Sequence, residues 1–501
     1  MGNELESLTC GMEIPYGGNK VTVVPENISE AFQKGDRLIV EQTGGDILHI
    51  PSSVWELSTQ AVGDAYSAFL KMGAVSDDAI SNFYSIFASR LADEKYFGKI
   101  SQANAEDVEL AKSKGRSTTR LVLSEKMRED MIAGLQLWER VPAQRGSSIE
   151  QIHHEGWKVE LVSAGLGVVG FIFEGRPNVF ADATGVLRSG NTVVFRIGSD
   201  ALKTANAIVK NALDPAIKES GLPKGAVTLV DSSERSAGYA MFSDDRLALA
   251  VARGSGSAVA LLGAVARQAG VPVSLHGTGG AWIVTGESAD PQKFSSAVFN
   301  SLDRKVCNTL NTCCISEESA PQLVPKFLEA ITKAAKSRDS KPKLHVTENA
   351  VNYIPDGWFS EISIERAEGE LLEKQTEIID TSQIGTEWEW ENSPEVTLVI
   401  VKDTAEAVML FNRYSPQFVV SLIAENLDEH HSFFEEINAP FVGNGFTRWV
   451  DGQYALNRPE LGLSNWHYGR LFGRGGVLSG DSILTVRTKA IQEDPNVSRR
   501  K

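Results

Sequence analysis

The sequence has few cysteines, no long apolar run and, apart from Arg499-Arg500-Lys501 at its end, no cluster of positive charge. Four cysteines in 501 residues give no disulfide framework, and neither Cys-x-x-Cys nor His-Glu-x-x-His occurs, so we expect no metal site. No apolar span reaches 18 residues, and the N-terminus lacks a basic start followed by an apolar stretch, so we expect a cytoplasmic protein. The net charge of -16 argues against nucleic acid or an acidic membrane as a partner.

The overall composition is that of a globular protein. Hydrophobic residues make up 42% and charged residues 23% of the chain. A chain of this length exceeds one simple core, so we expect two or three domains.

The first part of the chain shows short β patterns followed by helical ones. Apolar and polar residues alternate in 20–24, 36–40 and 46–50, which predicts short strands in a β-rich N-terminal extension over 1–70. From Ser76, apolar residues then fall on one helical face, with Ser76 or Asp77 as the N-cap. A further amphipathic helix is expected up to Leu137.

From about Val159 short apolar strands alternate with helices, which is typical of an α/β fold with a parallel sheet. The predicted strands are 168–173, 192–197, 226–230 and 247–252, with a helix at 201–213.

Two glycine clusters are candidates for binding phosphate. Gly165-Leu-Gly-Val-Val-Gly170 has the letters of a dinucleotide motif but runs into a strand, so it fails the context that the motif requires. Gly254, Ser255 and Gly256 follow a strand and open the predicted helix 258–268, so their amides suit a pyrophosphate, although an ordinary strand-to-helix turn has the same pattern.

Other polar residues at strand ends suit the adenosine end of a dinucleotide. Arg196 and Ser199 end the strand 192–197, where they favour the 2'-phosphate of NADP, although Arg196 is equally a surface charge.

Cys307 is the candidate nucleophile. It follows Arg304 and Lys305, and positive charge lowers a thiol pKa. A cysteine is more often a small core residue, and that is our prediction for Cys313 and Cys314 in the strand that follows. Trp388 and Trp390 are expected to pack on one face of a strand, and the acidic residues Glu387 to Glu391 around them to form a solvated edge.

At this point a family resemblance enters. Gly167-Val-Val-Gly-Phe-Ile-Phe-Glu-Gly-Arg-Pro-Asn-Val179 resembles the signature of the gamma-glutamyl phosphate reductase family, a branch of the aldehyde dehydrogenase superfamily. Further motifs agree in order and spacing over roughly residues 70 to 495: 188–191 with 196–201, 304–310, 412–414, 444–451 and 460–462.

The resemblance implies an aldehyde dehydrogenase-like α/β fold in several parts. After the extension 1–70 come a Rossmann-like NADP-binding domain at 71–275, with an oligomerisation hairpin near 145–165, and an α/β catalytic domain at 276–455. Residues 456–480 return to the NADP-binding domain, and 481–501 form an oligomerisation strand and tail. Together the hairpin and this strand make a small β element, and such proteins are usually homo-oligomers.

The resemblance also implies residue roles. Cys307 is similar to the family nucleophile, whose thiolate forms a thioester that NADPH reduces to an aldehyde, and the Asn178 amide is similar to the oxyanion donor. Glu391, or Glu389, is expected to hold the nicotinamide ribose. Substrate contacts are expected from three residues: Arg176, Asn308 and Arg448. An alternative role for Arg448 is to pin two domains together.

The predicted function is NADPH-dependent reduction of gamma-glutamyl phosphate or a related amino-acid acyl phosphate. Hydrolytic aldehyde dehydrogenases need a carboxylate base in a Glu-Leu-Gly-Gly motif, whereas this chain has Ser274-Leu-His-Gly-Thr-Gly-Gly280 there, with His276 as a base, a substrate contact or a structural residue. Gly280-Ala-Trp282 and Leu456-Asn-Arg-Pro459 depart from the family pattern, so the expected acids include ones other than glutamate. The alternatives are a CoA-acylating or oxidising aldehyde dehydrogenase and a non-catalytic nucleotide-binding or partner-binding descendant. A partner amino-acid kinase is expected, because acyl phosphates are short-lived in water.

Overall fold

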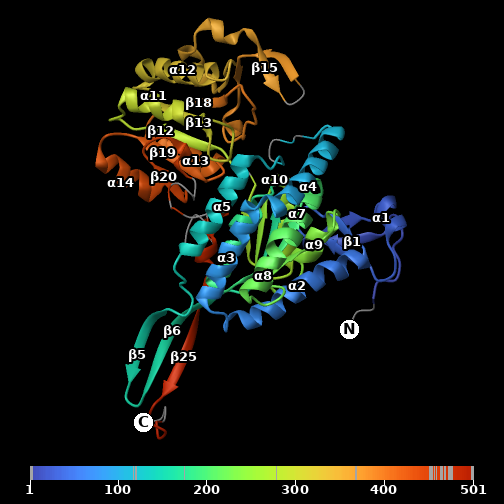
Figure 1. Ribbon diagram of the computed structural model, residues 1–501. Coiled ribbons are helices and arrows are strands. Elements are labelled where there is room, and N and C mark those ends of the chain that lie inside the picture. The colour runs from blue at the N-terminus through green and yellow to red at the C-terminus, as the bar shows by residue number, and fades with distance from the viewer. Residues whose placement is uncertain are drawn as a thin grey trace. The chain divides into compact units, whose positions relative to one another are not determined.

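The computed structural model describes residues 4–497 apart from 117, 119–120, 174, 255, 278, 367–368, 451–454, 456, 458–459, 463–465, 468–469 and 472–477 (Figure 1). The chain forms two compact units. Unit 1 contains Met1–Gly277, Asn457–Gly462 and Val477–Lys501, and unit 2 contains Thr278–Leu456 and Leu463–Gly476. No helix in the described ranges is long and apolar enough to cross a membrane.

Unit 1 begins with short strands, as expected, but its β structure ends twenty residues earlier than the sequence suggested. The elements are β1 Glu13–Tyr16, β2 Lys20–Val23, α1 Glu26–Ala31, β3 Arg37–Val40 and β4 Ile47–Ile50. The prediction of a β-rich segment up to residue 70 is wrong from Ser52 onward, because α2 (Ser52–Met72) buries Val54, Ala61, Val62 and Ala65 on one face. The extension therefore belongs to unit 1.

Three helices follow: α3 Asp77–Ala92, α4 Glu94–Ser113 and α5 Glu125–Arg140. Ser76 caps α3, since its hydroxyl accepts a hydrogen bond from the backbone N–H of Ala79 at 3.1 Å, which confirms the predicted helix start. Ser124 caps α5 in the same way through the N–H of Met127 at 3.2 Å.

A five-stranded parallel sheet forms the centre of unit 1, in the order β11, β10, β7, β8, β9. Its strands are Val273–His276, Leu247–Arg253, Val168–Phe173, Thr192–Ile197 and Val227–Leu229. The four predicted strands are confirmed, and the predicted helix at 201–213 forms as α7 Leu202–Ile208 and a π-helical turn Val209–Leu213. The other helices are α6 Val179–Ala183, α8 Asp214–Ser220, α9 Ser236–Phe242 and α10 Gly256–Gln268.

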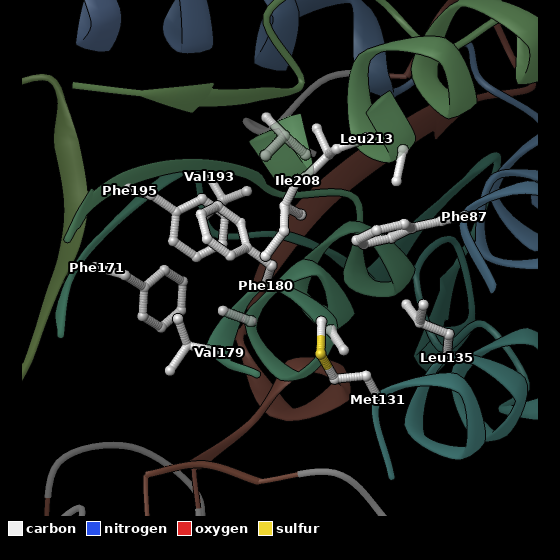
Figure 2. Packing of buried hydrophobic residues seen from close by; sticks show 14 of the residues in the cluster. Phe87, Met131, Leu135, Phe171, Val179, Phe180, Val193, Phe195, Ile208 and Leu213 are labelled. Atoms are coloured by element: carbon white, nitrogen blue, oxygen red, sulfur yellow. The ribbon is translucent and has the colours of Figure 1, made fainter. Parts of the chain in front are cut away.

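The sheet of unit 1 is buried on both faces, as continuous apolar strands require. One face packs Phe171 and Phe195 against Phe180 of α6 and Phe87 of α3 (Figure 2). The other face packs against α2, α9 and α10.

A three-stranded antiparallel sheet completes unit 1: β25 Leu484–Gln492, β6 Trp157–Gly165 and β5 Ser148–His154. The predicted hairpin is therefore present, and the C-terminal strand pairs with it, Leu484 opposite Gly165 through Gln492 opposite Trp157. Asn191 ties this strand to the parallel sheet, because its side chain accepts from Gly167 N at 2.9 Å and donates to Ile483 O at 2.8 Å.

Unit 2 is built on a seven-stranded parallel sheet in the order β17, β14, β18, β13, β12, β19, β20. The strands are Thr376–Ile378, Lys343–Val346, Glu395–Val401, Leu310–Ser316, Ala281–Thr285, Val419–Ile423 and Phe441–Gly443. Helices α11 Pro291–Asn300 and α12 Ala320–Lys336 pack on one face, and α13 Thr404–Tyr414 and α14 Leu427–Glu436 on the other.

Smaller elements in the later part of the chain include a hairpin, a 3-10 turn and two short strand pairs. The hairpin consists of β15 Glu361–Arg366 and β16 Gly369–Lys374, and η7 is a 3-10 turn at Thr447–Trp449. The pairs are β21 Glu460–Gly462 with β24 Leu478–Ser479, and β22 Trp466–His467 with β23 Arg470–Leu471.

Candidate active site

Cys307 lies in a turn of unit 2 between α11 and β13. The turn is closed by Thr309, whose hydroxyl accepts from Val306 N at 2.9 Å and donates to Arg304 O at 2.6 Å. Cys307 is half-buried, whereas Cys313 and Cys314 are completely buried in β13. Burial raises the pKa of both strand thiols, which confirms them as core residues. Cys307 is the thiol in this segment that remains accessible.

Two glycines pack directly against the Cys307 turn. The backbone N–H of Gly280 donates to the carbonyl of Cys307 at 2.7 Å. A Cβ on Gly279 would lie 2.5 Å from Cys307 Cα and 2.7 Å from Cys307 Cβ, which is closer than real Cβ contacts. Position 279 is therefore restricted to glycine by the close approach of the two backbone segments.

Glu387 completes the surroundings of Cys307. Its Oε2 accepts from Gly279 N at 2.6 Å, and its Oε1 forms a salt bridge with Lys305 Nζ at 2.6 Å. Both partners are largely shielded from solvent, with 16% of the Glu387 side chain and 8% of the Lys305 side chain exposed. The prediction of a solvated edge at Glu387 is thus wrong, and the charge of Lys305 is compensated by a carboxylate.

Local sequence gives no signal for Glu387. Its two partners lie 82 and 108 residues away in the chain, and four other charged or aromatic residues surround it in 388–391. Glu391 is exposed, and Glu389 is exposed with its carboxylate 3.7 Å from Lys305 Nζ. Of these three glutamates, Glu387 is the one that contacts the glycine packed against Cys307.

Asn308 and Arg448 support the turn from its other side. Asn308 is fully buried; its amide donates to Val450 O, and its Oδ1 accepts from the Arg448 guanidinium. Arg448 also pairs with Asp303 at 2.6 Å, and Thr447 Oγ1 donates to Asn308 O at 2.7 Å. Both residues were expected to contact substrate. In the structure the Arg448 guanidinium and the Asn308 side chain are hydrogen-bonded to each other within unit 2.

Asn178 and Arg176 lie in unit 1, in the segment after β7. Asn178 is half-buried at the start of α6, and its Nδ2 is 3.4 Å from Asp182 Oδ2. Arg176 is exposed. Their expected roles as oxyanion donor and substrate contact stay predictions.

The predicted phosphate turn follows β10 and opens α10, the context that a dinucleotide turn requires. Gly254 lies at the bend and Gly256 is the first residue of α10, whereas Ser255 lies outside the described residues. The other cluster, Gly165 to Gly170, runs from β6 into β7, so the structure confirms that it opens no helix.

Arg196 near the end of β8 suits an anion. Its Nη2 donates to Glu234 O at 3.0 Å, while its buried Nε has no acceptor among the described residues. Burial, together with the nearby Arg235, lowers the pKa of Arg196. A half-buried guanidinium with a buried, unmatched Nε donor is suited to accept an anionic ligand such as phosphate. Ser199, three residues on, is exposed.

Further basic side chains lie at the carboxyl edge of the same sheet, where parallel sheets bind ligands. Phe173, Arg253 and His276 occupy matching last positions of β7, β10 and β11. Burial, and then the positive charges of Arg253 and Arg176, lower the pKa of His276 to about 3. His276 is therefore neutral at physiological pH.

Each unit is built on a parallel sheet, with the Cys307 turn in unit 2 and the turn at Gly254 and Gly256 in unit 1. The fold of the chain is that of aldehyde dehydrogenase-like proteins. Residues 166–348 match the model of the aldehyde dehydrogenase family. The fold is shared with the gamma-glutamyl phosphate reductase of Thermotoga maritima, with TM-score 0.76 and 24% identity over 88% of this chain and 100% of that one. A putative aldehyde dehydrogenase from Burkholderia cenocepacia has TM-score 0.60 and 17% identity, over 92% and 97%.

Curated relatives carry the more particular name that the motifs indicated. Gamma-glutamyl phosphate reductase of Clostridium beijerinckii is 29% identical over 411 residues, which cover 80% of this chain and 91% of that protein. The enzyme of the same name from Halothermothrix orenii is 28% identical over 411 residues, covering 80% and 90%. The resemblance and the aldehyde dehydrogenase-like fold stated from the sequence are thereby confirmed.

Proposed function

We propose that this protein is an NADPH-dependent reductase that converts an acyl phosphate to an aldehyde through a thioester on Cys307. The substrate class is gamma-glutamyl phosphate or a related amino-acid acyl phosphate, in line with the names of the curated relatives.

The proposal rests on one observation: neither His276 nor Glu387 is placed to act as a general base that activates water against the thioester. In the segment where hydrolytic aldehyde dehydrogenases have a carboxylate base, this chain has His276, with a pKa lowered to about 3. So weak a base removes protons from water poorly at neutral pH. Both oxygens of Glu387 already accept from Gly279 and Lys305. Slow hydrolysis leaves the thioester for reduction, or for phosphate in the reverse direction.

The chemistry assigned to Cys307 is acyl transfer. Its thiolate attacks the acyl carbon, a C–S bond forms, and the C–O bond to phosphate breaks, so that phosphate departs with the bonding pair. NADPH, when bound, would supply the hydride that reduces the thioester carbon. Collapse of the adduct releases the aldehyde and regenerates the thiolate. The Asn178 amide and the Cys307 N–H are the proposed oxyanion donors.

The residues in unit 1 fit a phosphorylated dinucleotide. The α10 N-terminus at Gly254 and Gly256 would hold the pyrophosphate, and the unmatched Nε of Arg196, with Ser199, would hold a 2'-phosphate. A related fold, an engineered glycolyl-CoA reductase, has been solved with bound NADP+, at TM-score 0.57 and 15% identity. Glu391, or Glu389, is proposed to hold the nicotinamide ribose, because both are exposed, whereas both oxygens of Glu387 already accept from Gly279 and Lys305.

Phosphate binding is proposed for the basic edge made by Arg176 and Arg253, which would receive the leaving group. We also propose that a partner kinase transfers the acyl phosphate to this protein. Homo-oligomerisation is proposed to use the open edges of the sheet formed by β25, β6 and β5.

The test is the reverse reaction. NADP+ reduction is followed at the nicotinamide absorbance with glutamate-5-semialdehyde, with phosphate, with CoA and with neither, for the native chain and Cys307→Ser. We expect reduction that requires phosphate and is lost in the variant. CoA-dependent reduction would instead identify a CoA-acylating enzyme. Absence of turnover, together with Cys307 that resists iodoacetamide, would contradict the catalytic role.

A further inference from the structure

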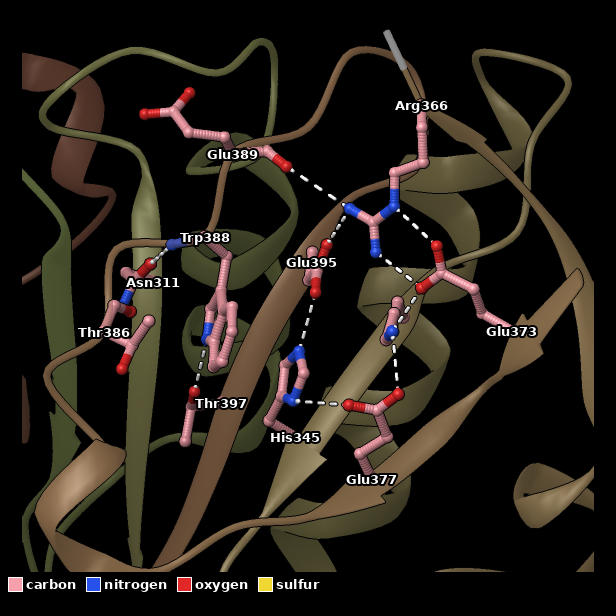
Figure 3. Close-up of polar contacts among 11 residues, drawn as sticks. Asn311, His345, Arg366, Glu373, Glu377, Thr386, Trp388, Glu389, Glu395 and Thr397 are labelled. Atoms are coloured by element: carbon pink, nitrogen blue, oxygen red, sulfur yellow. Dashed lines mark hydrogen bonds and ion pairs between the residues drawn. The ribbon is translucent and has the colours of Figure 1, made fainter. Parts of the chain in front are cut away.

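Glu387 is held in place by contacts on both of its chain neighbours. Asn311, four residues after Cys307 on β13, donates from Nδ2 to Thr386 O at 2.8 Å and accepts at Oδ1 from Trp388 N at 3.0 Å. One buried amide therefore fixes the backbone before and after Glu387 (Figure 3). The strand that carries the cysteine turn thus also sets the position of the carboxylate that contacts it.

The side chain of Trp388 is fixed as firmly as its backbone. Its indole N–H donates to Thr397 Oγ1 at 2.8 Å, and its ring is stacked on the imidazole of His345, with centroids 3.6 Å apart and planes 9° apart. The sequence predicted a strand face here, but 386–391 forms no strand, and the indole lies flat over β14 and β18 (Figure 3).

His345 is in turn held by a network of charged groups on four strands. Its Nε2 lies 2.7 Å from Glu395 Oε1 on β18, and its Nδ1 lies 3.8 Å from Glu377 Oε2 on β17. Glu395 pairs with Arg366 of β15 at 2.6 Å, and Arg366 binds both oxygens of Glu373 on β16. A planar ring fixed at one edge by a carboxylate cannot turn without breaking that bond, so it offers Trp388 a rigid platform.

We propose that Trp388, seated on His345, is a positioning residue that fixes the carboxylate of Glu387 against Gly279 and Lys305 and so sets the geometry of the Cys307 turn. Trp388 acts through Glu387, the residue before it in the chain. The inference deepens the proposed function, and rests on it for the turnover measurements alone.

The same segment provides a matched control. Trp390, two residues further on, is buried, whereas Trp388 is half-buried. Trp390 packs in the apolar cluster of β14, β18 and α12, and its ring lies 5.6 Å from the Arg338 guanidinium. Trp390→Ala removes as large a side chain from the same segment and leaves the His345 stack in place.

The test is a double-mutant cycle between Trp388→Ala and Glu387→Gln, with Trp390→Ala in both backgrounds. Four quantities are measured: kcat, KM for NADPH, the rate of Cys307 alkylation by iodoacetamide, and Tm. We expect Trp388→Ala to lower kcat on the order of tenfold to a hundredfold, with a smaller change in KM and a changed alkylation rate. In the Glu387→Gln background the further loss should be under about threefold. Trp388→Phe, which keeps the stack and loses the bond to Thr397, should recover most of the activity.

Two outcomes would overturn the inference. If the Trp388 and Glu387 effects multiply fully, Trp388 acts independently of the carboxylate. If Trp390→Ala lowers kcat as much as Trp388→Ala does, and both variants show the same drop in Tm, the loss of activity comes from general destabilisation. A native chain without turnover would refute the proposed function instead, and the alkylation rates would still test the positioning role.

Discussion

A single methyl group added at Gly279 should inactivate the protein without unfolding it. The alanine Cβ would lie 2.5 Å from Cys307 Cα, whereas ordinary contact begins at 3.4 Å, so the two segments must separate by about 0.9 Å. The neighbouring atoms are backbone and cannot rotate away. The same movement would stretch the bonds from Gly279 N to Glu387 and from Gly280 N to Cys307 O.

The magnitude follows from the size of that movement. A displacement of about 1 Å at a reacting group costs on the order of a hundredfold in rate, and overpacking costs about 1 to 3 kcal/mol of stability. We therefore expect Gly279→Ala to lower kcat by about two orders of magnitude and to unfold cooperatively.

The assay compares Gly279→Ala with Gly357→Ala. Gly357 lies in the same unit, and a Cβ added there would meet no atom within 4 Å. Turnover, the rate of Cys307 alkylation and denaturant unfolding are measured for both. The control should match the native chain. Native turnover and native alkylation in Gly279→Ala would refute the packing of this glycine against the nucleophile.

Two further predictions concern charged residues. The ion pair with Arg366, and to a lesser extent the one with Lys343, lowers the pKa of Glu373 from 4.5 to about 2. These ion pairs therefore stabilise the fold above pH 4.5, and their contribution is lost as the pH falls towards 2. Glu373→Gln should thus lose on the order of 2 kcal/mol of unfolding free energy at pH 7, a difference that shrinks below pH 4.5 in urea titrations; an equal difference at pH 3 would contradict the assignment. Arg196→Met should raise KM for NADP+ about tenfold or more, as expected for one charge-assisted hydrogen bond, and leave KM for NAD+ nearly unchanged; equal effects on both cofactors would exclude a 2'-phosphate contact.

The sequence was sufficient for four strands of the parallel sheet of unit 1, and it singled out Cys307 as the candidate nucleophile. Continuous apolar runs such as 168–173 form a strand in any parallel sheet that buries both faces, so their pattern needs no tertiary information. The cap at Ser76 is equally local, since a hydroxyl and an N–H three residues away suffice. Local patterns did not predict α2. The strand pattern was extended over these residues, whereas they form a helix whose apolar face is buried against α9 and β8.

The surroundings of Cys307 were decided by tertiary structure. The sequence singled out Cys307 from its basic neighbours and from motif order, both of which are properties of a short stretch. The sequence predicts a solvated edge at Glu387, because this residue begins an acidic stretch and nothing local distinguishes it from Glu389 and Glu391. Only the folding of β12, β13 and the 386–391 segment together brings Gly279, Lys305 and Glu387 into contact across about a hundred residues. Hydrogen bonds between such distant positions depend on which strands become neighbours, and no local periodicity encodes that order.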